Sequence, residues 1–296
     1  MLVAVLDVGS NTVRLLVAEV GRNGRLETVT SDKAYLGLGA EIARTGSLAA
    51  ESVGAAASVC TRFADRARAA GSERAEVIVT APGRQGAGAA TLVASLRGAT
   101  RLPVRVLTAD EEGRLAFDGA VARTSELPVS VGMVDVGGGS TEIVVGNRRS
   151  GARWVSSADL GSLRLARLVL HGDPPSKKEL AAARETVRSA LAPLSPPRPE
   201  AALAVGGSAR ALAKLVGRTF DAEAAETVIA RLARRRSAKV ARAAGIDERR
   251  AETLLGGALL LAESSRVLGR PLTLARGGLR EGAALALARE GAAAAA

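Results

Sequence analysis

The 296-residue chain is poor in cysteine, in aromatic residues and in histidine. Its single cysteine, Cys60, excludes an intrachain disulfide and a cysteine-based zinc site. Aromatic residues make up only 2% of the chain, so few rings are present to stack on nucleic-acid bases. The only histidine, His171, lies near the end of a predicted helix, where it suits a partner of the helix dipole better than a catalyst. We therefore expect no cysteine-based zinc site and no nucleic-acid partner.

Long apolar runs are also missing. No run approaches the length that crosses a bilayer. The first residues are apolar but have no basic segment before them and are interrupted by Asp7 and Asn11, which is not the pattern of a signal peptide. The expectation is a cytoplasmic protein without a membrane partner.

Lysine is scarce, although the chain is strongly basic. The formal net charge is +11, and only five of the 41 basic residues are lysines. The planar guanidinium of arginine is well suited to phosphate oxygens. A basic surface suits nucleic acid, anionic lipid or a polyanionic substrate, and an arginine-rich genome composition produces the same excess. Charge alone does not distinguish these alternatives.

A glycine-rich stretch, Asp135-Val-Gly-Gly-Gly-Ser-Thr-Glu142, stands between the apolar runs 129–134 and 143–145. Apolar run, glycine turn and apolar run predict a β-hairpin whose tip is bare backbone. Glycine reaches dihedral angles that other residues avoid and lets N–H groups approach a ligand closely. The tip therefore predicts a nest of amides for an anion, with the hydroxyls of Ser140 and Thr141 as further donors.

Carboxylates flank this tip, and they would repel an anion unless a cation lies between. Asp135 and Glu142 are hard oxygen ligands of the kind that a magnesium-like ion prefers. For an isolated Gly-Gly-Gly, a plain hairpin turn with ordinary flanking acids is the preferred alternative. A second copy of the pattern changes that balance.

The second copy is at the N-terminus, where Asp7-Val-Gly-Ser-Asn-Thr12 separates the apolar runs 2–6 and 13–17. Repetition at this separation predicts two related halves, each opening with a hairpin whose tip faces a shared cleft. Strands followed by helices in both halves indicate mixed sheets with helices on their faces. Residues 122–128 are the predicted boundary, which gives an N-terminal domain of residues 1–124 and a C-terminal domain of residues 125–296.

Five motifs in this order resemble those of the exopolyphosphatase and guanosine pentaphosphate phosphohydrolase (Ppx/GppA) family. They are Asp7–Arg14, Glu111–Leu115, Asp135–Glu142, Gly206–Ser208 and Gly277–Gly282, and they span nearly the whole chain. The resemblance implies an α/β fold of two actin-like domains, of the ribonuclease H-like, sugar kinase, Hsp70 and actin superfamily, with an interdomain cleft. The chain is similar to the short, two-domain form of the family.

The resemblance also implies roles for individual residues. Glu112 corresponds to the glutamate that acts as catalytic base, with Glu111 in reserve. Without the resemblance, two solvated acids at a helix N-terminus are the simpler interpretation. A like-charged neighbour can raise the pKa of one of the two. Asp135 and Glu142 correspond to the metal and catalytic acids, and Asp7 to a further acid that ligates the ion or orients the nucleophile.

The implied phosphate contacts are spread over the chain. They are Asp7, Ser10, Asn11, Arg14, Arg84, Gly137, Gly138, Gly139, Ser140, Thr141, Gly206, Gly207 and Ser208. Arg84 follows a loop that departs from the family pattern, because Pro82 and Gly83 change its backbone. Gly206–Ser208 opens a predicted helix, a geometry that favours phosphate. For Arg280 and Glu281 we favour a structural role.

The predicted function is the hydrolysis of terminal phosphate from inorganic polyphosphate, with Mg²⁺ as the cofactor and Mn²⁺ as the alternative ion. The nearest alternative is the hydrolysis of guanosine pentaphosphate (pppGpp) to the tetraphosphate. A kinase or nucleotidase, and a catalytically weak sensor of polyphosphate or of guanosine phosphates, are further alternatives. Apolar helix faces in the second half would allow a homodimer.

Overall fold

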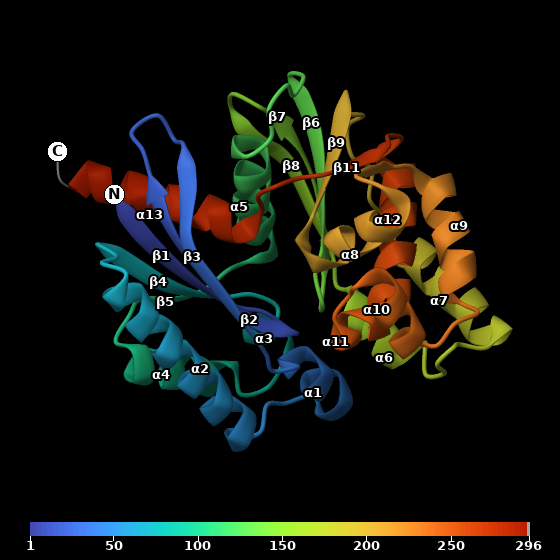
Figure 1. The fold of residues 1–296 in the computed structure, drawn as a ribbon, viewed down its shortest axis with the longest axis horizontal. Coiled ribbons are helices and arrows are strands. Elements are labelled where there is room, and N and C mark those ends of the chain that lie inside the picture. The colour runs from blue at the N-terminus through green and yellow to red at the C-terminus, as the bar shows by residue number, and fades with distance from the viewer. Residues whose placement is uncertain (295–296) are drawn as a thin grey trace. The chain divides into compact units, whose positions relative to one another are not determined.

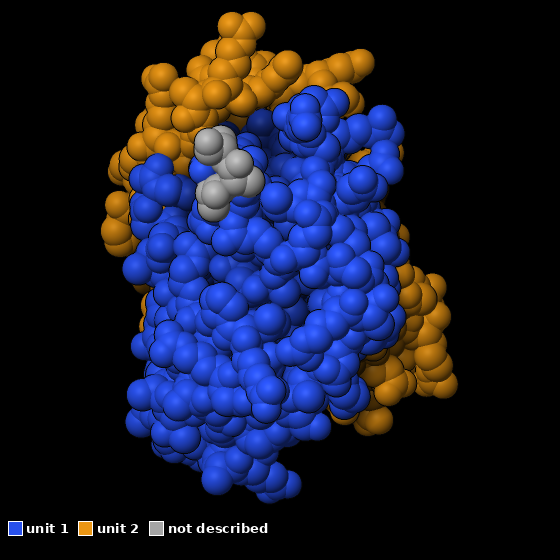
Figure 2. All heavy atoms as spheres, turned by 90° about the vertical axis from the view of Figure 1, so that its left-hand side faces the viewer, with its two compact units in different colours: residues 1–123, 277–296 blue, residues 124–276 orange. Residues whose placement is uncertain are grey.

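The chain forms two compact units in the computed structural model, which describes residues 1–294. Unit 1 comprises residues 1–123 and 277–296, and unit 2 comprises residues 124–276. Figure 1 shows the ribbon, and Figure 2 colours unit 1 blue and unit 2 orange. Each unit has its own sheet and its own hydrophobic core. We describe each unit by itself.

The C-terminal segment is where the units differ from the predicted domains. The first boundary lies within one residue of the expected position, but residues 277–296 belong to unit 1 instead of the C-terminal domain. Helix α13 (Leu279–Ala294) packs on helix α5 (Ala109–Ala122). The two backbones touch: a Cβ at Gly119 would overlap the carbonyl of Gly278, and a Cβ at Gly282 would overlap that of Leu115. The chain therefore returns to its first unit through a glycine contact that helical periodicity does not reveal.

Unit 1 contains a mixed five-stranded sheet in the order β3-β2-β1-β4-β5. The strands are β1 (Leu2–Val8), β2 (Thr12–Val20), β3 (Leu26–Tyr35), β4 (Arg74–Val79) and β5 (Val104–Val106). β1 to β3 are antiparallel neighbours, whereas β4 runs parallel to β1 and β5 parallel to β4. The predicted N-terminal hairpin is β1 and β2, so its tip lies at the carboxyl end of β1.

The two faces of this sheet bury different helices. Ala4, Leu6 and Val8 of β1 pack in a cluster with α2 (Ala50–Ala69) and α4 (Ala89–Thr100). Val3 and Val5 pack with α13 on the opposite face. Successive side chains of a strand alternate between the two faces. Asp7, which continues the series of Val3 and Val5, therefore lies on the α13 face.

Unit 2 repeats this plan. Its sheet has the order β10-β11-β9-β6-β7-β8, in which β8-β7-β6-β9-β11 matches β3-β2-β1-β4-β5 of unit 1. The strands are β6 (Ser130–Val136), β7 (Thr141–Asn147), β8 (Gly151–Ala158), β9 (Ala201–Val205), β10 (Thr219–Phe220) and β11 (Leu272–Leu274). β6 and β7 form the second hairpin, and β9 runs parallel to β6. The prediction of two related halves, each opening with a hairpin, is confirmed.

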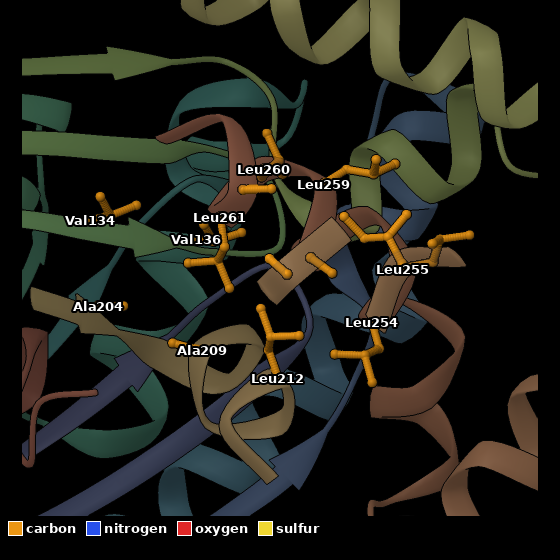
Figure 3. Close-up of a cluster of buried hydrophobic side chains, with 14 of the residues drawn as sticks. Val134, Val136, Ala204, Ala209, Leu212, Leu254, Leu255, Leu259, Leu260 and Leu261 are labelled. Atoms are coloured by element: carbon orange, nitrogen blue, oxygen red, sulfur yellow. The ribbon is translucent and has the colours of Figure 1, made fainter. Parts of the chain in front are cut away.

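One face of the unit 2 sheet carries a large aliphatic core, part of which Figure 3 shows. Val134 and Val136 of β6 meet leucines of α12 (Leu254–Leu268) and α8 (Gly206–Val216). Helices α7 (Lys177–Leu191) and α9 (Ala222–Leu232) contribute to the same cluster. By strand alternation, Asp135 and its partner Glu142 lie on the other face of the sheet.

Short helices complete the two units. Residues 37–46 contain helix α1 (Leu38–Thr45), and residues 81–88 contain helix α3 (Pro82–Gln85). Helices α10 (Ser237–Ala244) and α11 (Glu248–Glu252) lie between α9 and α12 in the sequence. The basic run 234–236 lies in the turn before α10.

Among residues 1–294, none of the helices combines the length and the hydropathy that a membrane span requires. The longest, α2, has charged residues along its exposed side.

Gly119→Ala tests the glycine contact between α5 and α13. The added Cβ would meet backbone that cannot rotate away, so we expect a loss of about 1–3 kcal/mol in the free energy of unfolding. Gly54→Ala in α2 is the matched control, because a Cβ there meets nothing within 4 Å and should stabilise the helix by about 0.5–1 kcal/mol. Urea unfolding of both variants measures the difference, and equal midpoints would refute the contact.

Candidate active site

Backbone hydrogen bonds fix the tip of the unit 1 hairpin. The Gly9 amide donates to the Thr12 carbonyl at 3.0 Å, and the Thr80 amide at the end of β4 donates to the Val8 carbonyl at 3.1 Å. Ser10 is buried, and its side chain packs on the backbone of Gly39 in α1. The structure therefore gives Ser10 a packing role against α1, and its predicted contact with phosphate stays a prediction.

Asn11 also acts through its backbone. Its carbonyl accepts hydrogen bonds from the amides of Leu36 and Gly37, each at 3.1 Å. These bonds fix the start of α1 beside the hairpin tip. The role predicted for the Asn11 side chain stays a prediction.

Asp7 and Arg14 are opposite each other in the β1–β2 register, so both side chains lie on the α13 face. Burial raises the pKa of Asp7 above its ordinary value, while the charges of Arg280 and Arg14 act in the opposite direction. Arg280, at the start of α13, also donates from Nη1 to the Leu15 carbonyl at 3.3 Å. The sheet therefore places Asp7 and Arg14 on the same face, where the charge of Arg280 also acts on Asp7.

Arg84 reaches two groups in unit 1. Its Nη1 donates to the Leu107 carbonyl at 2.6 Å, and its Nη2 donates to Glu112 Oε2 at 2.8 Å. Pro82 and Gly83, where the chain departs from the family pattern, form the start of the short helix α3 that carries Arg84. Proline suits the first turn of α3, and a Cβ at Gly83 would stand 2.8 Å from Val106 Cγ1, so only glycine lets α3 pack on β5.

Two neighbouring glutamates at the start of α5 have different partners. Glu111 closes a capping box: its carboxylate accepts from the Thr108 amide at 2.8 Å, and its amide donates to Thr108 Oγ1. These bonds, led by the one from the Thr108 backbone, lower the pKa of Glu111. Glu112 instead is buried, 8% exposed, and pairs with Arg84. The pKa of Glu111 is therefore lowered. The expectation that a like-charged neighbour raises the pKa of one of the two glutamates does not hold for Glu111.

These groups converge on one edge of the unit 1 sheet. Asp7 stands at the carboxyl end of β1, Thr80 follows β4, and the Leu107 carbonyl follows β5. Ligands of open α/β sheets bind outside the carboxyl ends of parallel strands. The unit 1 edge therefore has the position and the residue types of an anion site.

In unit 2 the glycine tip is fixed by helix α6 (Ser162–Leu168). The Gly137 carbonyl accepts from the Ser162 amide at 2.9 Å and from Ser162 Oγ at 3.0 Å. The amide of Leu163 donates to the Gly138 carbonyl at 3.0 Å. A Cβ at Gly161 would stand 2.6 Å from the amide nitrogen of Gly139, which shows how closely the backbones approach. The tip carbonyls thus satisfy free amides at the start of α6.

One expectation for this tip needs correction. The left-handed glycines of the described residues do not include Gly137, Gly138 or Gly139, so close approach, not unusual dihedrals, is what requires glycine here. The Thr141 hydroxyl donates to the Leu160 carbonyl at 2.7 Å, and Thr141 is fully buried. This bond braces the hairpin, and the predicted contact of Thr141 with an anion stays a prediction. Ser140 is also buried.

Asp135 and Glu142 face each other directly across the β6–β7 ladder. Glu142 is 1% exposed, and its Oε1 accepts from Ser157 Oγ at 2.9 Å. Asp135 Oδ1 lies against Gly206: a Cβ there would stand 2.7 Å from it, and the φ of Gly206 is +84°. Two like charges opposite each other on a sheet are destabilising unless something offsets them. The pair has the donor chemistry of a site for a hard cation.

The Gly206–Ser208 turn begins α8 as predicted. Ser208 is fully buried, and a Cβ at Gly257 of α12 would stand 2.8 Å from its Oγ. Within residues 1–294 the Ser208 hydroxyl has no hydrogen-bond partner. The predicted phosphate contact of this hydroxyl stays a prediction. The guanidinium of Arg250 lies over Gly207, where a Cβ would stand 2.6 Å from Nη2.

A metal triad does not appear in the structure. Among residues 1–294, no three side chains of histidine, cysteine, aspartate or glutamate gather closely enough to hold an ion. Asp135 and Glu142 alone fit a cation, with water and substrate oxygens left to complete an octahedral shell. The proposed ligation by Asp7 stays a prediction.

Comparison with known proteins decides the family. The family model of the "Ppx/GppA phosphatase family" matches residues 16–290. The chain belongs to this family.

Curated relatives and solved structures agree with this membership. Exopolyphosphatase 2 of Mycobacterium tuberculosis is 35% identical over 202 residues, covering 64% of this chain and 62% of that protein. The match thus spans about three fifths of the length of that relative. Exopolyphosphatase 1 of the same organism is 29% identical over 302 residues, covering 95% and 87% of the two chains.

The solved structures confirm the fold. The Ppx/GppA family member of Aquifex aeolicus superposes with a TM-score of 0.84 at 24% identity, covering 98% of both chains. An exopolyphosphatase from Cytophaga hutchinsonii gives a TM-score of 0.85 at 20% identity, covering 95% and 96%. The predicted α/β fold with two actin-like halves is confirmed for this Ppx/GppA chain.

Three residues near these groups were missed by sequence reasoning. Ser162 holds the glycine tip, Arg250 covers Gly207, and Thr80 ties β4 to the first hairpin. Ser162 carried a signal, since a serine beside glycine at the predicted start of a helix suggests a bond at a helix terminus. Arg250 carried none, because its partner lies 43 positions away in the sequence.

Arg280 and Glu281 have the structural role that we favoured, within unit 1. The Glu281 carboxylate accepts from the Gly278 amide at 2.9 Å and so caps α13. Arg280 bonds to the Leu15 carbonyl. Because its charge also acts on Asp7, Arg280 has an electrostatic part in the candidate site as well.

Glu111→Gln tests whether Glu111 caps α5 while Glu112 pairs with Arg84. A lowered pKa in the folded state means that the Glu111 carboxylate stabilises the fold above the ordinary glutamate pKa, and that this contribution is lost as the pH falls through the lowered value. The urea midpoint of the variant should lie below that of the native chain at pH 7, and the gap should close in acid. A gap that is unchanged down to pH 3 would contradict the capping role.

Proposed function

We propose that this chain is a phosphohydrolase that removes the terminal phosphate of inorganic polyphosphate. Family membership and the names of its relatives support a phosphoanhydride substrate. The observation that carries the proposal is the Arg84–Glu112 pair: a buried carboxylate beside an arginine, near the carboxyl ends of the parallel strands β4 and β5. Arginine over the transferred phosphoryl group and a carboxylate that orients water are the parts that this chemistry needs.

Glu112 is the proposed base. Water attacks the terminal phosphorus, its proton passes to the Glu112 carboxylate, and the bond to the bridging oxygen breaks to leave orthophosphate and a chain shortened by one phosphate. The bond from Arg84 Nη2 to Oε2 fixes the orientation of the carboxylate. The Arg84 guanidinium has five N–H donors, more than its two bonds to Glu112 and Leu107 use, so it can also contact a phosphate oxygen.

Asp135 and Glu142 are the proposed ligands of Mg²⁺, with Mn²⁺ as the alternative ion. A bound divalent ion would offset the charge that develops on the phosphate oxygens. Ser157 orients Glu142 through its hydroxyl, and Gly206 leaves room for the Asp135 carboxylate. The Asp7, Arg14 and Arg280 set of unit 1 is the proposed further contact with anionic oxygens, because two arginines there flank one acid.

Glu112→Gln tests the base. The amide keeps the size of the side chain but cannot accept a proton, so we expect phosphate release from polyphosphate to fall by at least about a hundredfold. Binding of polyphosphate and the urea midpoint should stay close to native values. Glu111→Gln is the matched control and should keep most of the activity. Native turnover in Glu112→Gln would overturn the proposal.

The substrate assay separates the alternatives. Phosphate release from short polyphosphate, long polyphosphate and pppGpp is measured side by side in the presence of Mg²⁺. Release from a polyphosphate that is lost in Glu112→Gln supports the proposal. Release from pppGpp alone would make the chain a guanosine pentaphosphate phosphohydrolase, and tight binding of polyphosphate without release would make it a sensor.

Asp135→Asn tests the metal ligands. Removing one of two carboxylates weakens a hard-cation site, so the Mg²⁺ concentration for half-maximal activity should rise at least about tenfold. Direct calorimetry with Mn²⁺ gives a second readout that does not depend on turnover. Asp159→Asn, an exposed aspartate of the same unit, is the control. Unchanged affinity for both ions in Asp135→Asn would exclude Asp135 as a ligand.

A further inference from the structure

Unit 2 contains a pocket that the proposed reaction does not use. Its volume is about 450 Å³, within the range of about 300–1,000 Å³ that is typical of small-molecule sites. It lies among α6, α10, α11 and the start of α12, which gather at one end of unit 2 in Figure 1. The loop 171–175 closes one side.

Both apolar and charged side chains line the pocket. The apolar lining residues are Leu163, Ala166, Leu170, Leu232, Val240, Ala251 and Leu255. Arg167 and Arg235 also line it and are exposed, and within residues 1–294 neither forms an ion pair. Two guanidinium groups together with apolar side chains are complementary to a ligand that has an apolar body and an anionic group.

Two acids, Asp173 and Glu252, also line the pocket, and they differ in their partners. Both oxygens of Asp173 are engaged by Ser237, at 2.7 Å from its amide and 2.8 Å from its hydroxyl. Glu252 is exposed and lines the pocket from α11. It offers an acceptor to a polar N–H of the ligand. His171 adds an imidazole beside the arginines.

The pocket is built before any ligand arrives. Glu179 accepts hydrogen bonds from the amides of His171 and Gly172, each at 2.9 Å, and caps α7 together with Ser176. With the Asp173–Ser237 bonds, this fixes residues 171–173 of the loop. A preformed wall lowers the ordering cost of binding.

One wall residue connects the pocket to the candidate active site. The Leu163 side chain lines the pocket, and the Leu163 amide holds the Gly138 carbonyl of the glycine tip at 3.0 Å. Gly256, beside Leu255 of the pocket wall, packs on the Ser162 carbonyl at the same helix start. A ligand that contacts Leu163 therefore touches the helix start that holds the hairpin carrying Asp135 and Glu142.

We propose that this pocket is an effector site for a small aromatic anion, with an apolar ring system against α6 and α12 and one phosphate, sulfonate or carboxylate group between Arg167 and Arg235. The binding part stands on the pocket alone, and the effector part rests on the proposed phosphohydrolase activity.

The binding test uses 8-anilinonaphthalene-1-sulfonate and its uncharged analogue N-phenyl-1-naphthylamine, titrated by fluorescence into the full chain. In Arg167→Glu/Arg235→Glu the sulfonate should bind at least tenfold more weakly, while the uncharged analogue should lose less than threefold. Ala166→Trp fills the pocket and should weaken both. Arg149→Glu, an exposed arginine on the β7–β8 turn, is the matched control and should bind like the native chain.

Thermal unfolding by circular dichroism checks that each variant is folded. If Ala166→Trp unfolds, Leu170→Trp at the outer wall replaces it. Native affinity for the sulfonate in both the charge-reversed and the filled variants would overturn the site. An equal loss of both probes in the charge-reversed variant would refute the role of the two arginines.

The effector test measures phosphate release from polyphosphate with saturating sulfonate probe. The rate should change at least twofold in the native chain and in Arg149→Glu, and not in Arg167→Glu/Arg235→Glu. An unchanged native rate would overturn the effector part. If the native chain releases no phosphate from any substrate, the proposed function fails, and the binding titration still decides the site.

Discussion

The parallel register of two strand pairs governs both halves of this protein. β4 runs beside β1 with Val79 level with Val8, and β9 runs beside β6 with Val205 level with Asp135. Each register brings the end of a buried parallel strand level with the tip of a hairpin. Thr80 can then bond to the first hairpin, and Gly206 can lie against the Asp135 carboxylate. A slip of one residue would turn every one of these side chains to the opposite face.

The repeated hairpins have diverged in charge while keeping their geometry. The position across the ladder from the aspartate is arginine in unit 1, where Arg14 faces Asp7, and glutamate in unit 2, where Glu142 faces Asp135. The unit 1 pair balances one negative charge with a guanidinium that can bind an anion, whereas the unit 2 pair has two carboxylates that suit a cation. A phosphoanhydride substrate with a divalent ion needs both kinds of group, so the two halves have complementary chemistry.

Sequence reasoning went furthest where a property belongs to a local segment. The hairpins and the start of α8 at Gly206 follow from short-range patterns. It did not give the direction of a side chain that depends on a distant element. The Ser208 side chain is buried against Gly257, and the Thr141 hydroxyl donates to the Leu160 carbonyl. Tertiary packing determines the direction of such side chains, because a hydroxyl can donate to any acceptor that packing brings within hydrogen-bond distance.

The sequence by itself determined the family, the two α/β halves and the candidate acids, because repeated motifs and the alternation of apolar residues are written along the chain. Only the tertiary structure decided three further points. Arg84 pairs with Glu112 while Glu111 caps its helix, and α13 belongs to unit 1. A pocket lined by apolar and charged side chains lies beside α6. Each of these points depends on contacts between residues that are distant in sequence, and the first gives the sequence neighbours Glu111 and Glu112 different partners. Such contacts follow from close packing in three dimensions, to which no local propensity refers.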